Sequence, residues 1–321
     1  MAHTDQPDRI VIAGGSGFVG ISLAQHLATL GYDVVILSRS KPQTPPGEHA
    51  PWRHAAWDGA TLGDWTNELD GAAGLVNLCG RTVDCIKTKA NRKQIMDSRV
   101  GPTKLLGEAM RAIENPPPAW VQMSTAHIYG DPPTQVCDES SPFGEGLAPT
   151  VGQAWEKAFD EAKLPETRGV VLRTSFVIGK PNAGGGGAMA RLGLLATLGL
   201  GGTVGHGNQG MSWIHELDMN RIFEKALTDG TMQGVYVATS PNPASNKEFM
   251  HKLRKALNRG LGRYIGLPAP AWLVRIGAPL LMRTDPELAI LGRYCVPTRL
   301  MNDGFGFEYA ELNDAMHTLN A

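Results

Sequence analysis

Residues 9–20 read Arg-Ile-Val-Ile-Ala-Gly-Gly-Ser-Gly-Phe-Val-Gly, and this stretch decides the fold. Its first part, 9–13, is a short apolar run typical of a buried strand. The glycines follow at once, and an apolar helical stripe comes after them and ends at Gly31. A second apolar run, 33–37, completes a strand, turn, helix and strand within about 30 residues, the size of a parallel crossover unit.

The spacing of the glycines, GxxGxxG, is typical of a dinucleotide-binding turn. Gly14 permits the tight turn, Gly17 lets backbone N–H groups approach a pyrophosphate, and Gly20 lets the helix pack closely on the sheet. The phosphates then lie at a helix N-terminus, which favours negative charge. The alternative is a glycine turn in another kind of α/β protein, but the flanking strands and helix favour the dinucleotide. The predicted contacts are Gly14, Ser16, Gly17, Phe18 and Val19.

The end of the second strand indicates which nicotinamide cofactor binds. An NAD site would place Asp or Glu here to accept hydrogen bonds from the ribose 2′-hydroxyl. This chain has Ser38 and Arg39 instead. A guanidinium can bind a 2′-phosphate in bidentate fashion, and a serine hydroxyl can assist. We therefore predict NADP(H); the alternative is that Arg39 is only a solvated loop charge.

The pattern of strand and helix continues to about residue 180. Apolar strands are expected at 74–78, 119–123 and 169–172, with helices at roughly 90–112 and 150–163. Strands that are apolar throughout are buried on both faces. The sequence therefore predicts an α/β fold, a doubly wound parallel sheet of the Rossmann type.

The regular alternation of strands and helices ends after residue 180, where a glycine-dense segment extends to residue 210. The glycine run 184–187 reads as a lid or as a disordered loop. Beyond it we expect one strand at 234–238 and helices near 215–228, 246–258 and 270–282. The predicted domains are an NADP-binding domain at 8–180, with returning segments at about 211–240, and a smaller α+β substrate lobe at 181–321.

Charge and composition narrow the possible partners. The 321 residues carry 30 Lys and Arg against 31 Asp and Glu, so the basic surplus of a nucleic-acid binder is missing. No apolar stretch approaches the length of a membrane span, and residues 1–8 do not resemble a signal peptide, so a cytoplasmic location is expected. The four cysteines are too scattered for a zinc site, and no metal is predicted. The expected partner is an unidentified small molecule; the oligomeric state is not encoded in any visible pattern.

Several longer motifs resemble one known superfamily. They are AGGSGFVG at 13–20, SRS at 38–40, VNLCG at 76–80, SRVGPT at 98–103, STAHIYG at 124–130, and GHGNQGMSWIHELD at 205–218. The chain is similar to extended short-chain dehydrogenases/reductases, and more closely to an atypical epimerase-family branch. In that branch a C-terminal domain of unknown function follows, here at about 268–316, where VPTRLMNDGFGFEY at 296–309 matches it.

The resemblance implies further cofactor contacts. Leu78 and Cys79 would pass beside the cofactor ribose, and Val177 would lie near the nicotinamide. Arg99 stands where the superfamily often has an active-site Asn, and Gln94 lies on the same helix. The alternatives are plain core positions for Leu78 and Val177 and a surface helix charge for Arg99.

The usual catalytic pair of the superfamily, Tyr-xxx-Lys, is missing. Its two positions fall on Ala148 and Gly152, and neither residue can transfer a proton. The remaining candidates are Thr125, which matches the superfamily's catalytic Ser/Thr, with His127 and Tyr129 just beyond the strand end. The alternative interpretations are that His127 is a structural or solvated loop histidine and that Tyr129 is a packing residue. Cleft-lining positions are expected at Gln209, Trp213 and His215.

Two functions are consistent with these features. The first is an NADP(H)-dependent oxidoreductase or epimerase-like enzyme that acts on a carbonyl or sugar-nucleotide-like substrate with an unusual proton donor. The second is an NADP(H)-binding sensor or scaffold without catalysis, suggested by the missing pair. Turnover of a substrate panel, or partner binding that depends on NADPH, would separate them.

Overall fold

The computed structural model describes residues 7–43, 49–132 and 135–320. Its centre is a seven-stranded sheet in the order β11-β7-β5-β4-β1-β2-β3, with every pairing parallel. The strands are β1 Arg9–Ala13, β2 Asp33–Ser38, β3 Arg53–Ala56, β4 Gly74–Asn77, β5 Ala119–Thr125, β7 Arg168–Thr174 and β11 Gly234–Ala238.

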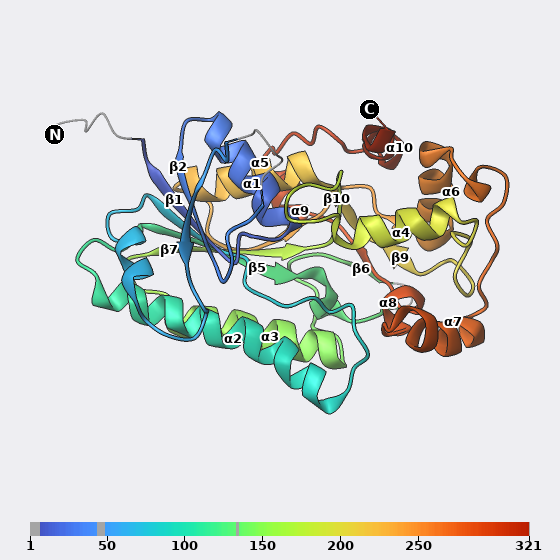
Figure 1. The fold of residues 1–321 in the computed structure, drawn as a ribbon, viewed down its shortest axis with the longest axis horizontal. Helices are drawn as coiled ribbons and strands as arrows, with labels where there is room; N and C mark the ends of the chain where they lie inside the picture. The colour runs from blue at the N-terminus through green and yellow to red at the C-terminus, as the bar shows by residue number, and fades with distance from the viewer. Residues whose placement is uncertain (1–6, 44–48, 133–134, 321) are drawn as a thin grey trace.

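Helices cover both faces of this sheet (Figure 1). On one face α1 (Phe18–Thr29) lies beside α5 (Glu216–Thr228), and on the other α2 (Lys89–Ala112) packs along α3 (Leu147–Ala162). Two apolar cores fill the spaces between the layers, one under each helix pair. Burial on both sides explains why the central strands are apolar at nearly every position.

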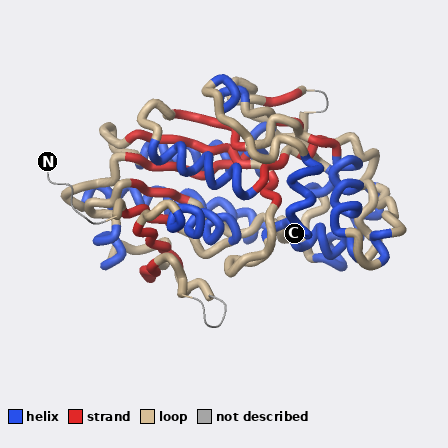
Figure 2. Tube along the Cα trace, turned by 90° about the horizontal axis from the view of Figure 1, so that it is seen from above, coloured by secondary structure: helices blue, strands red, loops and turns tan. Residues whose placement is uncertain are grey.

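The remaining elements form a second, mainly helical part at one end of the molecule (Figure 2). Its own core joins α4, α6 and α10 through residues such as Met189, Phe249 and Leu312. The helices are α4 Gly187–Thr197, α6 Asn246–Leu257, α7 Ala271–Gly277, α8 Glu287–Ile290, α9 Thr298–Asn302 and α10 Leu312–His317, with a π-helical turn at Ala278–Met282 and 3₁₀ turns at Asp64–Glu68, Ala126–Tyr129, Leu261–Arg263 and Thr318–Asn320. Short strand pairs lie outside the central sheet: β8 Phe176–Ile178 pairs with β10 Trp213–His215, β9 Gly210–Met211 with β12 Ala244–Ser245, and β6 Val136–Cys137 with β13 Tyr294–Cys295.

The predicted fold class is confirmed, but several elements were missed, among them β3 and α4. Strand β3 is short, polar and at the edge of the sheet, so it lacks the apolar signature of the buried strands. Helix α4 lies inside the glycine-dense segment, where glycines mask its helical pattern. The division into two domains near residue 180 stays a prediction. No helix among the described residues is long and apolar enough to cross a membrane.

Candidate functional site

The turn between β1 and α1 has the geometry that the glycine spacing predicts. Gly14 adopts a positive φ of +72° and donates its N–H to the carbonyl of Leu37 at 2.9 Å. Gly17 is the N-cap of α1, and no side chain caps the first N–H groups of the helix. A Cβ on Gly20 would lie 2.4 Å from the carbonyl oxygen of Gly15, which explains why only glycine lets the helix approach this closely.

The segment after β8 returns to this turn and lies directly on it. β8 contains Val177, which is partly buried against the sheet core. Farther on, the Asn182 side chain donates to the carbonyl of Phe18 at 2.9 Å. A Cβ on Gly184 would lie 2.3 Å from the carbonyl carbon of Gly17, so the glycine run is an ordered cover over the helix start. The other two residues predicted here are Ser16 and Val19, both partly exposed.

The tip of β2 presents a guanidinium to solvent. Arg39 is exposed and makes no hydrogen bond or ion pair with any described residue. Ser38 is buried, and its hydroxyl donates to the carbonyl of Ser40 at 2.8 Å. The Nε2 atom of His54 lies 3.1 Å from the same hydroxyl oxygen. Sequence reasoning missed His54 because it missed β3, which brings it there.

The loop after β4 touches the glycine turn. The N–H of Leu78 donates to the carbonyl of Ala13 at 2.8 Å, and Leu78 is partly buried. A Cβ on Gly14 would lie 3.0 Å from the Cα of Cys79. Burial raises the pKa of the Cys79 thiol to about 12, so it stays protonated at neutral pH. Both predicted residues therefore lie beside the fingerprint turn.

A buried polar network holds this loop, and sequence reasoning did not find it. The Asn77 side chain accepts from the N–H of Cys79 at 3.0 Å and donates to Gln122 and Thr103 at 2.9 Å each. The indole N–H of Trp155 donates to the Thr103 hydroxyl at 3.2 Å. Because every member has a partner, the network fixes the loop rather than destabilising it.

Arg99 on α2 points inward. Its guanidinium donates to the carbonyls of Ile95 at 3.0 Å and Arg81 at 3.2 Å, and lies 5.1 Å from the ring centroid of Trp155. A Cβ on Gly80 would lie 3.0 Å from the Arg99 Cζ atom. Burial, with the charge of Arg81, lowers the pKa of Arg99 to about 10. The Arg99 guanidinium therefore packs against Gly80, the residue that follows Cys79.

Gln94, the other residue predicted on α2, is exposed and accepts a hydrogen bond from Arg81. The loop between β4 and α2 contacts the second part of the molecule. Asp84 forms an ion pair with Arg191 of α4 at 2.8 Å. The loop after β4 therefore links the fingerprint side of the sheet to α4 of the second part.

The catalytic candidates follow the end of β5. Thr125 is its last residue and caps the next turn, since its hydroxyl accepts from the N–H of His127 at 3.2 Å. His127 is partly buried. Burial, together with the positive charge of Arg293, holds the pKa of His127 well below its usual value. The imidazole is therefore neutral at pH 7 and can donate or accept one hydrogen bond.

Tyr129 is buried in a different environment. Only 2% of it is exposed, and its hydroxyl accepts from Arg173 at 2.9 Å. Arg173 forms an ion pair with Glu156 at 2.8 Å, and the Ser124 hydroxyl donates to Glu156 at 2.6 Å. Burial raises the pKa of Tyr129 well above its usual value. The phenol is thus engaged within the protein, and proton transfer from it would require breaking this network.

The structure also shows where the two positions of the missing catalytic pair lie. Both positions lie in the first turns of α3, with Ala148 exposed and Gly152 buried. A Cβ on Gly152 would already lie 3.0 Å from the Cγ1 atom of Ile128. A side chain at this position would therefore require Ile128 to shift by a few tenths of an ångström.

The three positions expected to line a cleft in the second part are buried. Trp213 is fully buried, and its indole donates to the carbonyl of Asn242 at 2.9 Å. His215 is 6% exposed, and its Nδ1 atom caps α5 by accepting from the N–H of Leu217. Gln209 is 8% exposed. Whether these side chains line a cleft stays a prediction.

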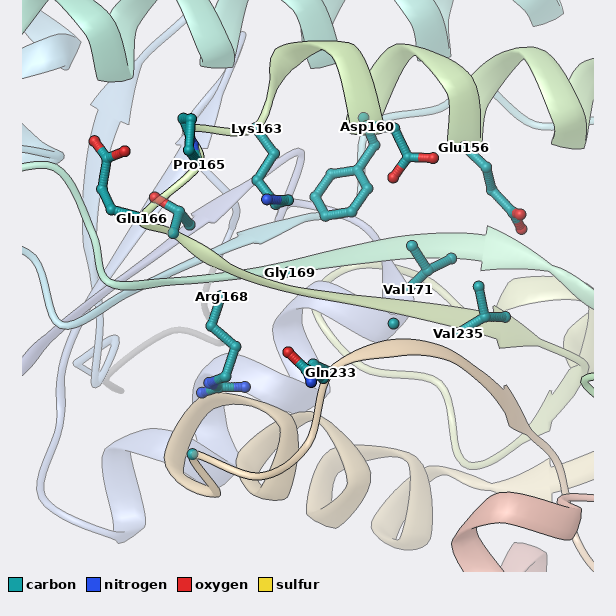
Figure 3. A pocket seen from close by; sticks show the side chains of 14 residues that line it. Glu156, Asp160, Lys163, Pro165, Glu166, Arg168, Gly169, Val171, Gln233 and Val235 are labelled. Carbon is teal, nitrogen blue, oxygen red and sulfur yellow. The ribbon is translucent and has the colours of Figure 1, made fainter.

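A hollow of about 600 Å³ opens between the end of α3 and the first residues of β7 and β11 (Figure 3). Its wall includes Asp160, Lys163, Glu166, Arg168 and Gln233. None of the predicted site residues lines it. Parallel sheets bind ligands at the carboxyl ends of their strands, whereas this hollow lies where β7 and β11 begin, so we do not assign it to the cofactor.

These features together define a class of protein. A glycine turn leads into α1, an arginine lies at the tip of β2, and a polar strand end follows β5; the arrangement is a dinucleotide-binding Rossmann domain with a second part beside it.

The sequence model of the NAD dependent epimerase/dehydratase family matches residues 10–238, and that of a domain of unknown function, DUF1731, matches residues 269–319. The chain belongs to the NAD dependent epimerase/dehydratase family. It is 32% identical to human epimerase family protein SDR39U1, over 98% of this chain and 100% of that protein. It is 27% identical to epimerase family protein YfhF of Bacillus subtilis, over 97% and 98%.

Solved structures give the same result. The crystal structure of human SDR39U1 (isoform2) with NADPH superposes with a TM-score of 0.81 at 30% identity, covering 97% of this chain and 98% of that one. A nucleoside-diphosphate sugar epimerase from Corynebacterium glutamicum superposes with a TM-score of 0.73 at 28% identity, covering 98% of this chain and 58% of that one. The resemblance inferred from the sequence motifs is confirmed.

Proposed function

We propose that this protein is an NADPH-dependent oxidoreductase or epimerase-like enzyme of its family. The observation that carries the proposal is Arg39, an exposed guanidinium without a protein partner among the described residues, at the point where an NAD site would carry a carboxylate. The residues present fit the cofactor: a Cβ on Gly17 would meet nothing within 4 Å at the helix start, Gly20 lets the helix pack closely on the turn, and Leu78 and Cys79 lie beside it. The human relative solved with NADPH supports the same cofactor.

The polar strand end supplies the chemistry on the protein side. When bound, NADPH supplies a hydride to a carbonyl carbon. The Thr125 hydroxyl and the neutral imidazole of His127 would hydrogen-bond the substrate oxygen and stabilise the negative charge that develops there, and solvent would supply the proton that completes the alcohol. Tyr129 would hold the turn in place through Arg173. The substrate is a carbonyl compound or a sugar-nucleotide-like molecule.

A second candidate is an NADPH-binding sensor or scaffold. The observation that favours it is that Ala148 and Gly152, which cannot transfer a proton, occupy the positions of the usual catalytic pair at the start of α3. A panel of carbonyls, carbinols and nucleotide sugars, assayed with NADPH or NADP⁺, distinguishes the two. Turnover that falls at least about tenfold in His127→Gln, as expected on losing a group that hydrogen-bonds the substrate oxygen, supports the enzyme. No turnover, with a protein partner whose affinity depends on NADPH, supports the sensor.

Replacing Arg39 with alanine is expected to weaken NADPH binding about 10- to 100-fold. A hydrogen bond to a charged group contributes about 1.5–3 kcal/mol, and this variant removes the bidentate donor to the 2′-phosphate. NADH has no such phosphate, so its affinity should change less than about threefold. Fluorescence titration of both cofactors measures the effect. Arg259→Ala, which removes a distant exposed charge, is the control. An equal loss for NADPH and NADH would remove Arg39 from the 2′-phosphate site.

A further inference from the structure

Arg293 is a buried cation held rigidly by its backbone. It lies between α8 and β13 and is 9% exposed. Its N–H donates to the carbonyl of Gly210 at 2.9 Å, and its carbonyl accepts from the Ser212 hydroxyl at 2.9 Å. A Cβ on Gly210 would lie 2.3 Å from the Arg293 carbonyl carbon, so the two segments are in close contact. The position of the side chain therefore follows from a fixed backbone.

The guanidinium of Arg293 is nevertheless poorly satisfied. Its Nε atom donates to the carbonyl of Gly130 at 2.7 Å, and its two terminal nitrogens bond to no described residue. No carboxylate of the described chain lies within ion-pair distance. Two other arginines differ: the half-buried Arg168 donates to three carbonyls, and the buried Arg173 donates to Glu156 and Tyr129. Burying a cation without a counter-ion costs free energy, which a bound anion would offset.

This cation lies at the candidate catalytic turn. The N–H of Gly130 donates to the carbonyl of His127 at 3.1 Å, while the carbonyl of Gly130 accepts from Arg293. The same residue thus links His127 to the guanidinium. The charge of Asp131 favours the charged form of Arg293, but the Asp131 carboxylate forms no ion pair with the guanidinium and accepts from the N–H of Gly292 at 2.6 Å. The other titratable groups that act on Arg293 are Cys137 and Cys295.

We propose that Arg293 binds an anionic group of the substrate, a carboxylate or a phosphate, directly beside His127. The proposal rests on the function proposed above and specifies its substrate: the negative charge would lie close to the reacting carbon, since Thr125 and His127 are at the same strand end. A small oxo acid or a phosphorylated carbonyl compound has this arrangement. A nucleotide sugar whose only charge is a diphosphate far from the reacting carbon does not.

The test follows the imidazole of His127 by NMR as phosphate or malonate is added at constant ionic strength, with and without NADPH. The His127→Gln variant identifies its signal among the nine histidines. Anion binding at Arg293 would screen the charge that opposes imidazole protonation, so each bound anion should raise the pKa of His127 saturably, by about 0.5 or more. Phosphate and malonate as separate arms show which chemistry the site prefers.

The Arg293→Gln variant gives the decisive comparison. It should raise the pKa of His127 without any anion, and it should weaken phosphate or malonate binding about tenfold or more. Arg293→Lys should still bind the anion but with an altered affinity, and Arg259→Gln should change nothing. Equal anion responses in Arg293→Gln and the unaltered protein would overturn the proposal, as would a response to uridine diphosphate but to neither small anion. If Arg293→Gln does not fold, Arg293→Lys replaces it: the proposal then requires that the saturable shift persist in this variant with an altered affinity, and an unaltered affinity overturns it. NADPH binding to the unaltered protein is measured in parallel. If this protein does not bind NADPH, the proposed function is refuted, but the anion site is not.

Discussion

Replacing Arg173 with methionine is expected to lower the free energy of unfolding by about 3–5 kcal/mol, because it leaves the carboxylate of Glu156 buried without its partner. The pair is well formed: two nitrogens of Arg173 donate to the two oxygens of Glu156 at 2.9 and 2.8 Å, and only 5% and 12% of the side chains are exposed. Although burial opposes the charge, these bonds raise the pKa of Arg173. Urea denaturation with linear extrapolation measures the loss.

The control for this prediction is a double-mutant cycle. Arg173→Met combined with Glu156→Gln removes both charges, so the double variant should be less destabilised than the sum of the two single variants. Lys157→Met removes an exposed charge of the same helix and should change stability by less than about 0.5 kcal/mol. Additive effects in the cycle, or a loss below about 1 kcal/mol in Arg173→Met, would show that the pair does not support this turn.

Replacing Gly20 with alanine is expected to cost about 1–3 kcal/mol of stability and to weaken NADPH binding about tenfold or more. The new Cβ would lie 2.4 and 2.5 Å from the carbonyl oxygen and Cα of Gly15, and backbone atoms cannot rotate away as a side chain would. The start of α1 would move relative to β1, and its N–H groups would lose their alignment with the pyrophosphate. Thermal unfolding and NADPH titration measure the two effects.

Substitutions at two other glycines distinguish the effect of packing on stability from the effect of cofactor contact on NADPH binding. Gly101→Ala on α2 meets nothing within 4 Å and should not destabilise the protein. Gly17→Ala also meets nothing within 4 Å and has a negative φ, so it should leave stability unchanged. It should still weaken NADPH binding, because its Cβ would lie where the pyrophosphate approaches the helix. Unchanged stability in Gly20→Ala would contradict the packing explanation.

The sheet and the cofactor turn could be predicted because their signals are local. Strands buried on both faces are apolar throughout, and a glycine turn between strand and helix has a fixed spacing; the stretch 9–37 alone contains both. Strand β3 lacks this signal, since an edge strand such as Arg53–Ala56 exposes its polar side chains. With it, the contact of His54 with Ser38 was also missed.

The catalytic region was harder because its decisive contacts are between distant segments. Arg293 reaches Gly130 across 163 positions, and Arg173 reaches Tyr129 across 44. No spacing rule relates such residues, so the sequence indicated His127 and Tyr129 as equal candidates. The structure distinguishes their surroundings: Tyr129 is held by Arg173, whereas His127 lies beside the poorly satisfied Arg293.

The most direct test of the central claim is calorimetric titration of the unaltered protein with NADPH and with NADH under the same conditions. An exposed guanidinium at the tip of β2, with no carboxylate at that position, predicts that NADPH binds at least about tenfold more tightly than NADH. Equal affinities, tighter binding of NADH, or no heat with either cofactor would contradict it.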